Sequence, residues 1–316
     1  MSDSPSTPIS RRRLPRRNID GVLLLDKPSG ITSNAALSRI KRLYNPRKAG
    51  HTGTLDPLAS GLLPICFGSA TRFAQFLLDA DKRYTATIRF GVATTTLDAE
   101  GDVIATRPVT FARPELEATL ARFTGVIRQV PPAHSALKFE GRPHYEYARR
   151  GIDVPRPPRD VTIHGLTLVA WRAPDAIVDV HCGKGTYVRS LASDIGGAIG
   201  CGAHLAALRR TASGGFDIAN AMSLAALEAM DARERDARIA PARVLVAHMP
   251  PLRLSPAVAT RFRHGEAVAA IGFADGIAAV FEGDVLIGVA EVSEQVAMPR
   301  RTVATHEDRA LNPVES

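Results

Sequence analysis

The stretch Gly50-His51-Thr52-Gly53-Thr54-Leu55-Asp56-Pro57-Leu58-Ala59-Ser60-Gly61 places one carboxylate in a run of small and apolar residues. Pro57 restricts Asp56 to an extended or turn conformation, because the proline ring clashes with a helical residue before it. Burying a carboxylate in these surroundings is costly unless a partner compensates its charge. Two interpretations follow, a functional acid or an aspartate that caps a turn or a helix.

The composition favours a folded protein with a sizeable core. Of the 316 residues, 45% are hydrophobic, and the length suits one large domain with a small one, or two domains. No run of about 18 apolar residues occurs, so we predict no membrane span. Five arginines near the N-terminus are not followed by the apolar stretch of a signal peptide, so we expect the chain in the cytoplasm.

The cysteines and histidines give no sign of a disulfide scaffold or of a metal site. Cys66, Cys182 and Cys201 form no Cys-x-x-Cys pair. The nine histidines are scattered and form no His-Glu-x-x-His arrangement. We therefore expect no metal.

The positive charge is unevenly distributed along the chain. The formal net charge is +8, with +4 in residues 1–18, +7 in residues 19–250 and −3 in residues 251–316. A basic main body suggests a polyanionic partner, although a merely soluble basic protein is an alternative. Residues 1–18 are rich in Ser, Pro and Arg, so we predict a disordered basic tail.

Hydrophobic periodicity predicts a chain of mixed strands and helices. Ser33 is expected to cap a helix over 34–44, and Asn45-Pro46 to end it. The other predicted helices cover 70–78, 114–123, 143–150, 186–199 and parts of 223–245. The predicted strands begin at Gly21 and cover 82–92, 125–129, 135–139, 161–171, 176–182 and 205–211.

The pattern changes near Pro250-Pro251. Beyond this point, glycines separate short alternating runs such as 277–281 and 285–289, which is typical of a small β-barrel. We predict a main domain over 19–250 and a small β-domain over 251–316.

Three further residues could serve a site around Asp56. Arg189, near the start of a predicted helix, could keep a buried carboxylate ionised, or it could lie on a solvated helix face. Tyr84 follows two cations and could stack on a nucleobase, although strand tyrosines usually pack against neighbours. His51 could also stack on a base, or it could simply belong to a turn.

Five segments, in this order, carry a resemblance to a known family. They are Gly21-Val22-Leu23-Leu24-Leu25-Asp26-Lys27-Pro28-Ser29-Gly30, the Asp56 stretch continued to Pro64, Asp81-Lys82-Arg83-Tyr84, Ser135-Ala136-Leu137-Lys138 and Cys182-Gly183-Lys184-Gly185-Thr186-Tyr187-Val188-Arg189-Ser190-Leu191. Together they resemble the TruB family of pseudouridine synthases, strongly over 19–215 and weakly over the C-terminal part.

The resemblance implies an α+β fold, with a mixed, largely antiparallel sheet flanked by helices and a C-terminal PUA-like barrel. It implies isomerisation of uridine to pseudouridine in the T-loop of tRNA, at position 55, without a cofactor. The bacterial form fits better than the guide-RNA form, because of the proline-rich insert and the compact barrel. The expected partner is the T-stem-loop of tRNA, and we expect a monomer with no obligate protein partner.

The resemblance also assigns roles to individual residues. Asp56 matches the essential aspartate, Arg189 the arginine that pairs with it, and Tyr84 the tyrosine that stacks on the target base and can act as acid or base. The residues matched to substrate binding are His51, Lys27, Lys138 and Leu208.

Two alternatives to this function remain open. The basic body and the predicted barrel also suit a module that binds and folds tRNA independently of catalysis. A pseudouridine synthase that acts on another RNA would carry the same motifs.

Overall fold

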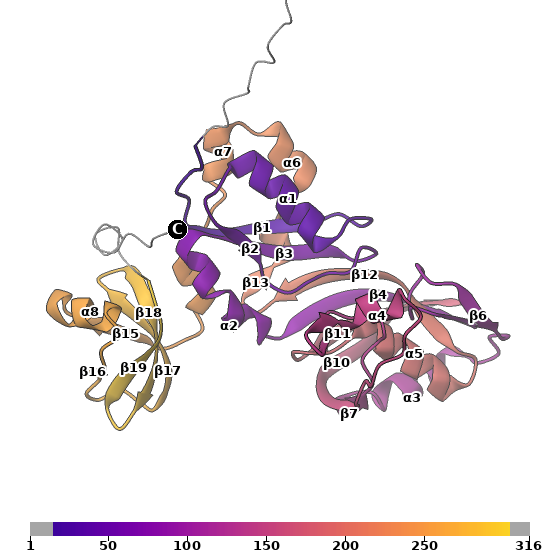
Figure 1. The fold of residues 1–316 in the computed structure, drawn as a ribbon. Helices are drawn as coiled ribbons and strands as arrows, with labels where there is room; N and C mark the ends of the chain where they lie inside the picture. The colour runs from indigo at the N-terminus through magenta and orange to yellow at the C-terminus, as the bar shows by residue number, and fades with distance from the viewer. Residues whose placement is uncertain (1–14, 304–316) are drawn as a thin grey trace, which may run out of the picture.

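The body of the protein is a ten-stranded mixed sheet. A computed structural model describes residues 15–303, and Figure 1 shows the sheet running across the molecule from β1 to β7. In spatial order the path is β14 (Met222–Ser223), β1 (Gly21–Lys27), β3 (Ser60–Phe67), β12 (Ala203–Ser213), β4 (Lys82–Phe90), β11 (Asp175–Cys182), β10 (Arg159–Arg172) and β7 (Gly125–Gln129). β2 (Ala49–His51) pairs with β3, and β13 (Phe216–Asp217) pairs with β12.

Most strand pairs of this sheet are antiparallel. The parallel pairs are β1 with β14 and β3 with β12. The predicted mixed, largely antiparallel sheet is therefore confirmed.

Helices cover the two halves of the sheet separately (Figure 1). α1 (Ser33–Tyr44), α6 (Leu224–Ala229) and α7 (Ala232–Asp236) lie over the β1–β3 half, and α3 (Arg113–Ala121) and α5 (Val188–Ile199) lie under the β4–β7 half. The remaining short elements are η1 (Gly68–Arg72), α2 (Ala74–Leu78), β5 (Val92–Thr94), β6 (Val103–Thr106), β8 (Lys138–Phe139), β9 (Arg142–Pro143), α4 (His144–Ala148), η2 (Ile218–Asn220) and η3 (Ala242–Val246).

The apolar stripe of α1 explains how the first half of the sheet is covered. Leu37, Ile40 and Tyr44 recur every three or four residues and pack against the buried strand residues Leu23 and Leu63. The predicted cap is wrong by one position. Thr32 caps the helix by accepting a hydrogen bond from the N–H of Ala35 at 3.0 Å, whereas the Ser33 hydroxyl is used elsewhere, as described below.

Two other predicted elements differ from the structure. The helix expected over 70–78 is split into η1 and α2 at Phe73. The strand expected over 135–139 is reduced to the two residues of β8, which pair only with β9. Residues 70–78 lie at the contact with the C-terminal sheet, and residues 135–137 line the cleft described below. Tertiary contacts outweigh local propensity at both places.

The C-terminal part forms a small five-stranded sheet, consistent with the predicted PUA-like barrel. Its order is β15 (Pro251–Leu254), β17 (Gly276–Glu282), β18 (Val285–Ser293), β19 (Val296–Thr302) and β16 (Val268–Ala269), with α8 (Pro256–Arg263) packed on it. Ala279 and Val289 of this sheet share a hydrophobic cluster with Val22 and Phe73 of the body. The two parts are therefore joined by apolar packing, and the division at 250 stays an interpretation.

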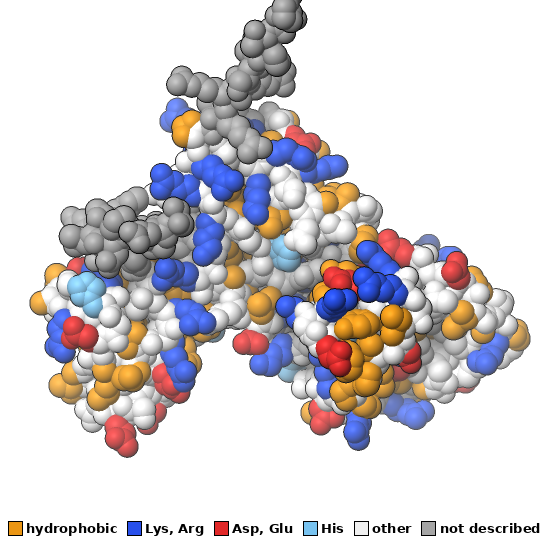
Figure 2. Space-filling view, viewed as in Figure 1, with side chains coloured by type: hydrophobic (Ala, Val, Ile, Leu, Met, Phe, Trp, Pro, Cys, Tyr) orange, Lys and Arg blue, Asp and Glu red, His pale blue; other side chains and the backbone are white. Residues whose placement is uncertain are grey.

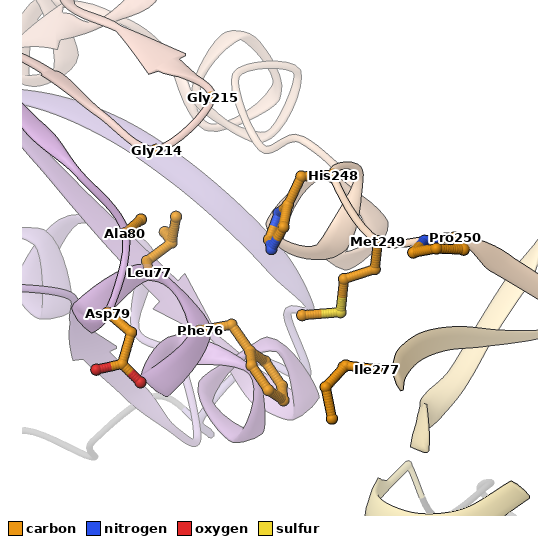
Figure 3. A pocket seen from close by; sticks show the side chains of 10 residues that line it. All are labelled: Phe76, Leu77, Asp79, Ala80, Gly214, Gly215, His248, Met249, Pro250 and Ile277. Carbon is orange, nitrogen blue, oxygen red and sulfur yellow. The ribbon is translucent and has the colours of Figure 1, made fainter. Parts of the chain in front are cut away.

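A cavity of about 500 Å³ lies at this junction. Phe76, Met249 and Ile277 line one side of it and His248 another (Figure 3). None of the predicted site residues lines this cavity.

No helix within residues 15–303 is long and apolar enough to cross a membrane. Most of the predicted basic tail, residues 1–14, lies outside the described residues. Within the described part, Arg17 forms an ion pair with Asp236 of α7.

Candidate active site

The loop that carries Asp56 is fixed on both sides of this residue. The buried Ser33 hydroxyl accepts a hydrogen bond from the N–H of Leu55 at 2.8 Å and donates one to its carbonyl oxygen at 3.0 Å. On the other side, the N–H of Gly30 donates to the carbonyl of Pro57 at 2.8 Å. The backbone around Asp56 is therefore held by α1 and by the turn after β1.

One arginine lies between two carboxylates at the centre of the site. Nε of Arg189 is 2.9 Å from Oδ2 of Asp56 and 3.6 Å from Oδ2 of Asp98. The side chains of Arg189 and Asp98 are 5% and 4% exposed, whereas that of Asp56 is 41% exposed. Asp98 is thus a buried counter-ion, and Asp56 is the carboxylate that a ligand can reach.

The remaining nitrogens of Arg189 are bound to main-chain oxygens. Nη2 donates to the carbonyl of His134 at 2.7 Å, and Nη1 donates to that of Thr96 at 3.2 Å. The arginine, at the start of α5, therefore connects the Asp56 loop, the Asp98 loop and the segment before Ser135.

Asp56 lies in a cleft of about 380 Å³. Tyr84 of β4 and Leu208 of β12 line it from the sheet, and residues 135–137 and 185–189 line it from two loops and the start of α5. The structure therefore brings together Asp56, Arg189, Tyr84 and Leu208, which lie far apart in the sequence.

Burial and nearby charges act in opposite directions on the pKa values of Asp56 and Tyr84. Burial raises the pKa of Asp56; the positive charge of Arg189 opposes this rise, and the negative charge of Asp98 adds to it. Burial likewise raises the pKa of Tyr84, and the charge of Arg210 opposes that rise. Arg189 thus favours the ionised form of Asp56 against the effect of burial.

The other predicted substrate-binding residues do not line the cleft. Lys27 is 0% exposed and donates to the carbonyls of Pro28 and Ile31 at 2.9 and 2.7 Å. His51 is half-buried in β2, and Lys138 is exposed in β8, directly after the cleft segment 135–137. Their assigned roles stay predictions.

The described residues contain no group of three His, Cys, Asp or Glu side chains placed to hold a metal ion.

Three family models together match most of the chain. Residues 41–188 match the TruB family pseudouridylate synthase N-terminal domain, residues 189–253 the tRNA pseudouridylate synthase B C-terminal domain, and residues 250–303 the C-terminal domain of pseudouridine synthase II TruB. The chain belongs to the TruB family of pseudouridine synthases.

Curated relatives and solved structures agree with this membership. The chain is 53% identical to tRNA pseudouridine synthase B of Thiobacillus denitrificans over 92% of its own length and 98% of the relative. It is 55% identical to the protein of the same name in Burkholderia mallei, over 93% and 97% of the two chains. A chain in the crystal structure of a Cbf5-Nop10-Gar1 complex shares the fold with a TM-score of 0.70 and 28% identity, over 90% of this chain and 84% of that one.

Sequence reasoning did not assign a role to two residues of this TruB-family site. Asp98 stands in a threonine-rich polar loop, and nothing in its spacing relates it to Arg189, which lies 91 positions later in the chain. Ser33 has the composition of a helix cap, and only the fold places its hydroxyl against Leu55. The same loop also carries Glu100 and Asp102, so nothing in the sequence singled out Asp98.

Proposed function

We propose that the protein isomerises uridine to pseudouridine in tRNA, at position 55 in the T-loop, with Asp56 as the reacting carboxylate. The observation that carries this proposal is the reachable carboxylate of Asp56, 2.9 Å from a buried arginine in a cleft lined by Tyr84. Membership of the TruB family supports the reaction, and the names of the curated relatives support tRNA as the substrate.

The reaction breaks the N-glycosidic bond, turns the uracil and joins its C5 to the ribose C1′. An ionised Asp56 can attack C1′, or it can remove the ribose 2′-proton to give a glycal. Both routes need an ionised carboxylate, and Arg189 favours that form. The reaction is an isomerisation, so the proton lost from C5 is balanced by one gained at N1.

The target base must leave the folded T-loop to reach Asp56. Extruding a base costs a few kcal/mol, which stacking in a pocket recovers. Tyr84 offers an aromatic face and Leu208 an apolar surface in the same cleft. In this proposal both hold the extruded uracil.

The surface suits a polyanionic partner. Exposed cations occur on α1 and on the segments that follow it, namely Lys41, Arg42, Arg47, Lys48 and Arg72. Figure 2 shows Lys and Arg side chains over the body and towards the C-terminal sheet. Phosphate contacts of this kind position an RNA without reading its sequence.

Release of tritium from RNA carrying [5-³H]uridine tests the proposal, because forming the new bond removes the hydrogen from C5. The substrate is a T-stem-loop RNA, and an anticodon stem-loop RNA serves as comparison. Asp56→Asn should abolish release. Asp175→Asn is the matched control, because Asp175 pairs with Arg89 at 2.8 Å outside the cleft and should keep wild-type release.

Turnover by Asp56→Asn would reject the role of Asp56. Binding without turnover by the wild type would favour an RNA-binding module, and release from the anticodon stem-loop alone would favour another RNA target.

We also propose that the chain acts as a monomer without an obligate partner, because residues of one chain line the cleft. The purified chain should then be active alone and elute as a monomer in gel filtration. Because tRNA is the proposed substrate, we propose the cytoplasm as the location of the protein.

A further inference from the structure

Arg210 is a buried cation beside the cleft to which no role has been assigned so far. It is 1% exposed, and no carboxylate within residues 15–303 forms an ion pair with it. Its Nε donates to the carbonyl of Leu62 at 2.7 Å, and its Nη2 donates to the carbonyl of Gly53 at 2.9 Å. Burying a charge without a counter-ion is costly. The position of Arg210 therefore suggests that its two main-chain hydrogen bonds serve a purpose.

The strand register places Arg210 between the two elements of the site. In β12 it pairs with Tyr84 of β4 on one side and with Gly61 of β3 on the other. Residues directly opposite on adjacent strands have neighbouring side chains. The guanidinium therefore lies next to Tyr84, and the backbone of Arg210 lies next to the end of the Asp56 loop.

Two glycines allow Arg210 to hold this loop at both ends. A Cβ at Gly61, where φ is +103°, would lie 2.3 Å from the carbonyl oxygen of Arg210. A Cβ at Gly53, where φ is +74°, would lie 3.3 Å from its Nη1. The first residue of the loop, Gly53, thus contacts the side chain of Arg210, and the last, Gly61, contacts its backbone.

We propose that Arg210 is a positioning residue for the isomerisation: it closes the loop 53–61 that carries Asp56 and fixes its own charge beside Tyr84. This inference rests on the proposed function. It does not make Arg210 a group that touches the substrate.

The electrostatics agree with this placement. Burial raises the pKa of Tyr84, and the positive charge of Arg210 opposes the rise. The same charge contributes, after burial, to lowering the pKa of His51. Arg210 thus influences the aromatic residue of the cleft as well as the loop.

Arginine suits this position better than lysine. The planar guanidinium presents donors in fixed directions and so reaches Leu62 and Gly53 together, whereas an ammonium is a compact point charge. Arg210→Lys therefore retains the positive charge but loses the planar set of donors that contacts both carbonyls. Arg235→Lys is the matched control, because Arg235 also donates to two main-chain carbonyls, those of Met230 and Leu227, away from the cleft.

The experiment combines hydrogen exchange with single-turnover kinetics. In Arg210→Lys, amides of residues 53–59 should exchange about tenfold faster or more, while the C-terminal sheet stays unchanged. The single-turnover rate at saturating T-stem-loop RNA should fall about 10- to 100-fold, because small displacements of a reacting group are costly. RNA affinity should change less than about threefold, since Arg210 is not at the surface. Arg235→Lys should leave all three unchanged.

Gly53→Ala disturbs the same contact from the loop side and serves as a second variant if Arg210→Lys does not fold. It should give the same local exchange and the same loss of rate. Unchanged exchange at 53–59, or faster exchange throughout the sheet with no preference for the loop, would overturn the proposal. A wild type that makes no pseudouridine would reject the proposed function instead, and the exchange measurement would still decide whether Arg210 holds the loop.

Discussion

Replacing Arg189 with methionine keeps most of the side-chain volume and removes the charge between Asp56 and Asp98. Asp98, at 4% exposure, would then be a buried carboxylate without its cation. Removing one partner of a buried ion pair costs about 3–5 kcal/mol. At roughly 2 °C per kcal/mol for a chain of this size, the melting temperature should fall by about 6–10 °C.

The double variant Arg189→Met, Asp98→Asn separates the charge from the other contacts of the arginine. Neutralising Asp98 should recover most of the lost stability. The carbonyls of Thr96 and His134 would still lack their donor, which leaves a deficit of about 1 kcal/mol for each. Pseudouridine formation should not return, because Asp56 would still lack the cation that favours its ionised form.

Urea unfolding followed by circular dichroism measures these differences, with tritium release measured on the same samples. Arg89→Met is the control, because Arg89 forms an ion pair of similar length with Asp175 but is 48% exposed, and such pairs contribute at most about 1 kcal/mol. A loss below about 1 kcal/mol in Arg189→Met, or a double variant no more stable than the single one, would refute the reasoning.

Three further outcomes follow from the site. Asp98→Asn removes a like charge that raises the pKa of Asp56, so the acid limb of the single-turnover pH–rate profile should move to lower pH; a limb that stays or moves upward would contradict this. Ser33→Ala leaves two buried backbone groups of Leu55 unpaired and should lower the unfolding free energy by about 2–4 kcal/mol in urea, with the exposed Ser38→Ala as control. Burial lowers the pKa of Lys27 to about 8, below the value of about 10.5 expected in the unfolded chain. Between these two pH values the unfolded state binds one proton more than the folded state, so the free energy of unfolding rises with pH. This rise should be smaller in Lys27→Met, and the same pH dependence of the urea midpoint in both proteins would contradict the assignment.

The local hydrophobic pattern was enough to predict a helix or strand where that element has one apolar face. The strands expected over 161–171 and 176–182 are β10 and β11, which run over 159–172 and 175–182, and the helix expected over 34–44 is α1. Ser60–Phe67 received no strand prediction, because its apolar residues run almost continuously without alternation. It became β3, whose parallel partner β12 lies about 150 residues later in the chain, and such a non-local pairing leaves no local pattern.

Some residues of the candidate site could likewise be predicted from the sequence, and others could not. Asp56 drew attention because a carboxylate in an apolar run is unusual. Arg189 and Tyr84 were candidates from their residue types and neighbours, with alternatives that the resemblance decided between, and Leu208 came from the resemblance alone. Asp98 and Arg210 carry no such signal, because their importance lies in contacts made only in the folded chain. Composition could not show that either residue is buried.

The difference in exposure between the two carboxylates suits them to different roles in the proposed reaction. In the proposed reaction Asp56 changes its charge or forms a bond, and in either case it stops compensating the charge of Arg189. A buried arginine left alone at that moment would raise the energy of the reacting state, because its charge would be desolvated without a partner. Asp98 is almost fully buried, 3.6 Å from the same Nε, and on a different loop, so under this proposal it remains as a second counter-charge when Asp56 reacts. The second carboxylate therefore makes the arginine a lasting part of the site, at the cost of a higher pKa for Asp56.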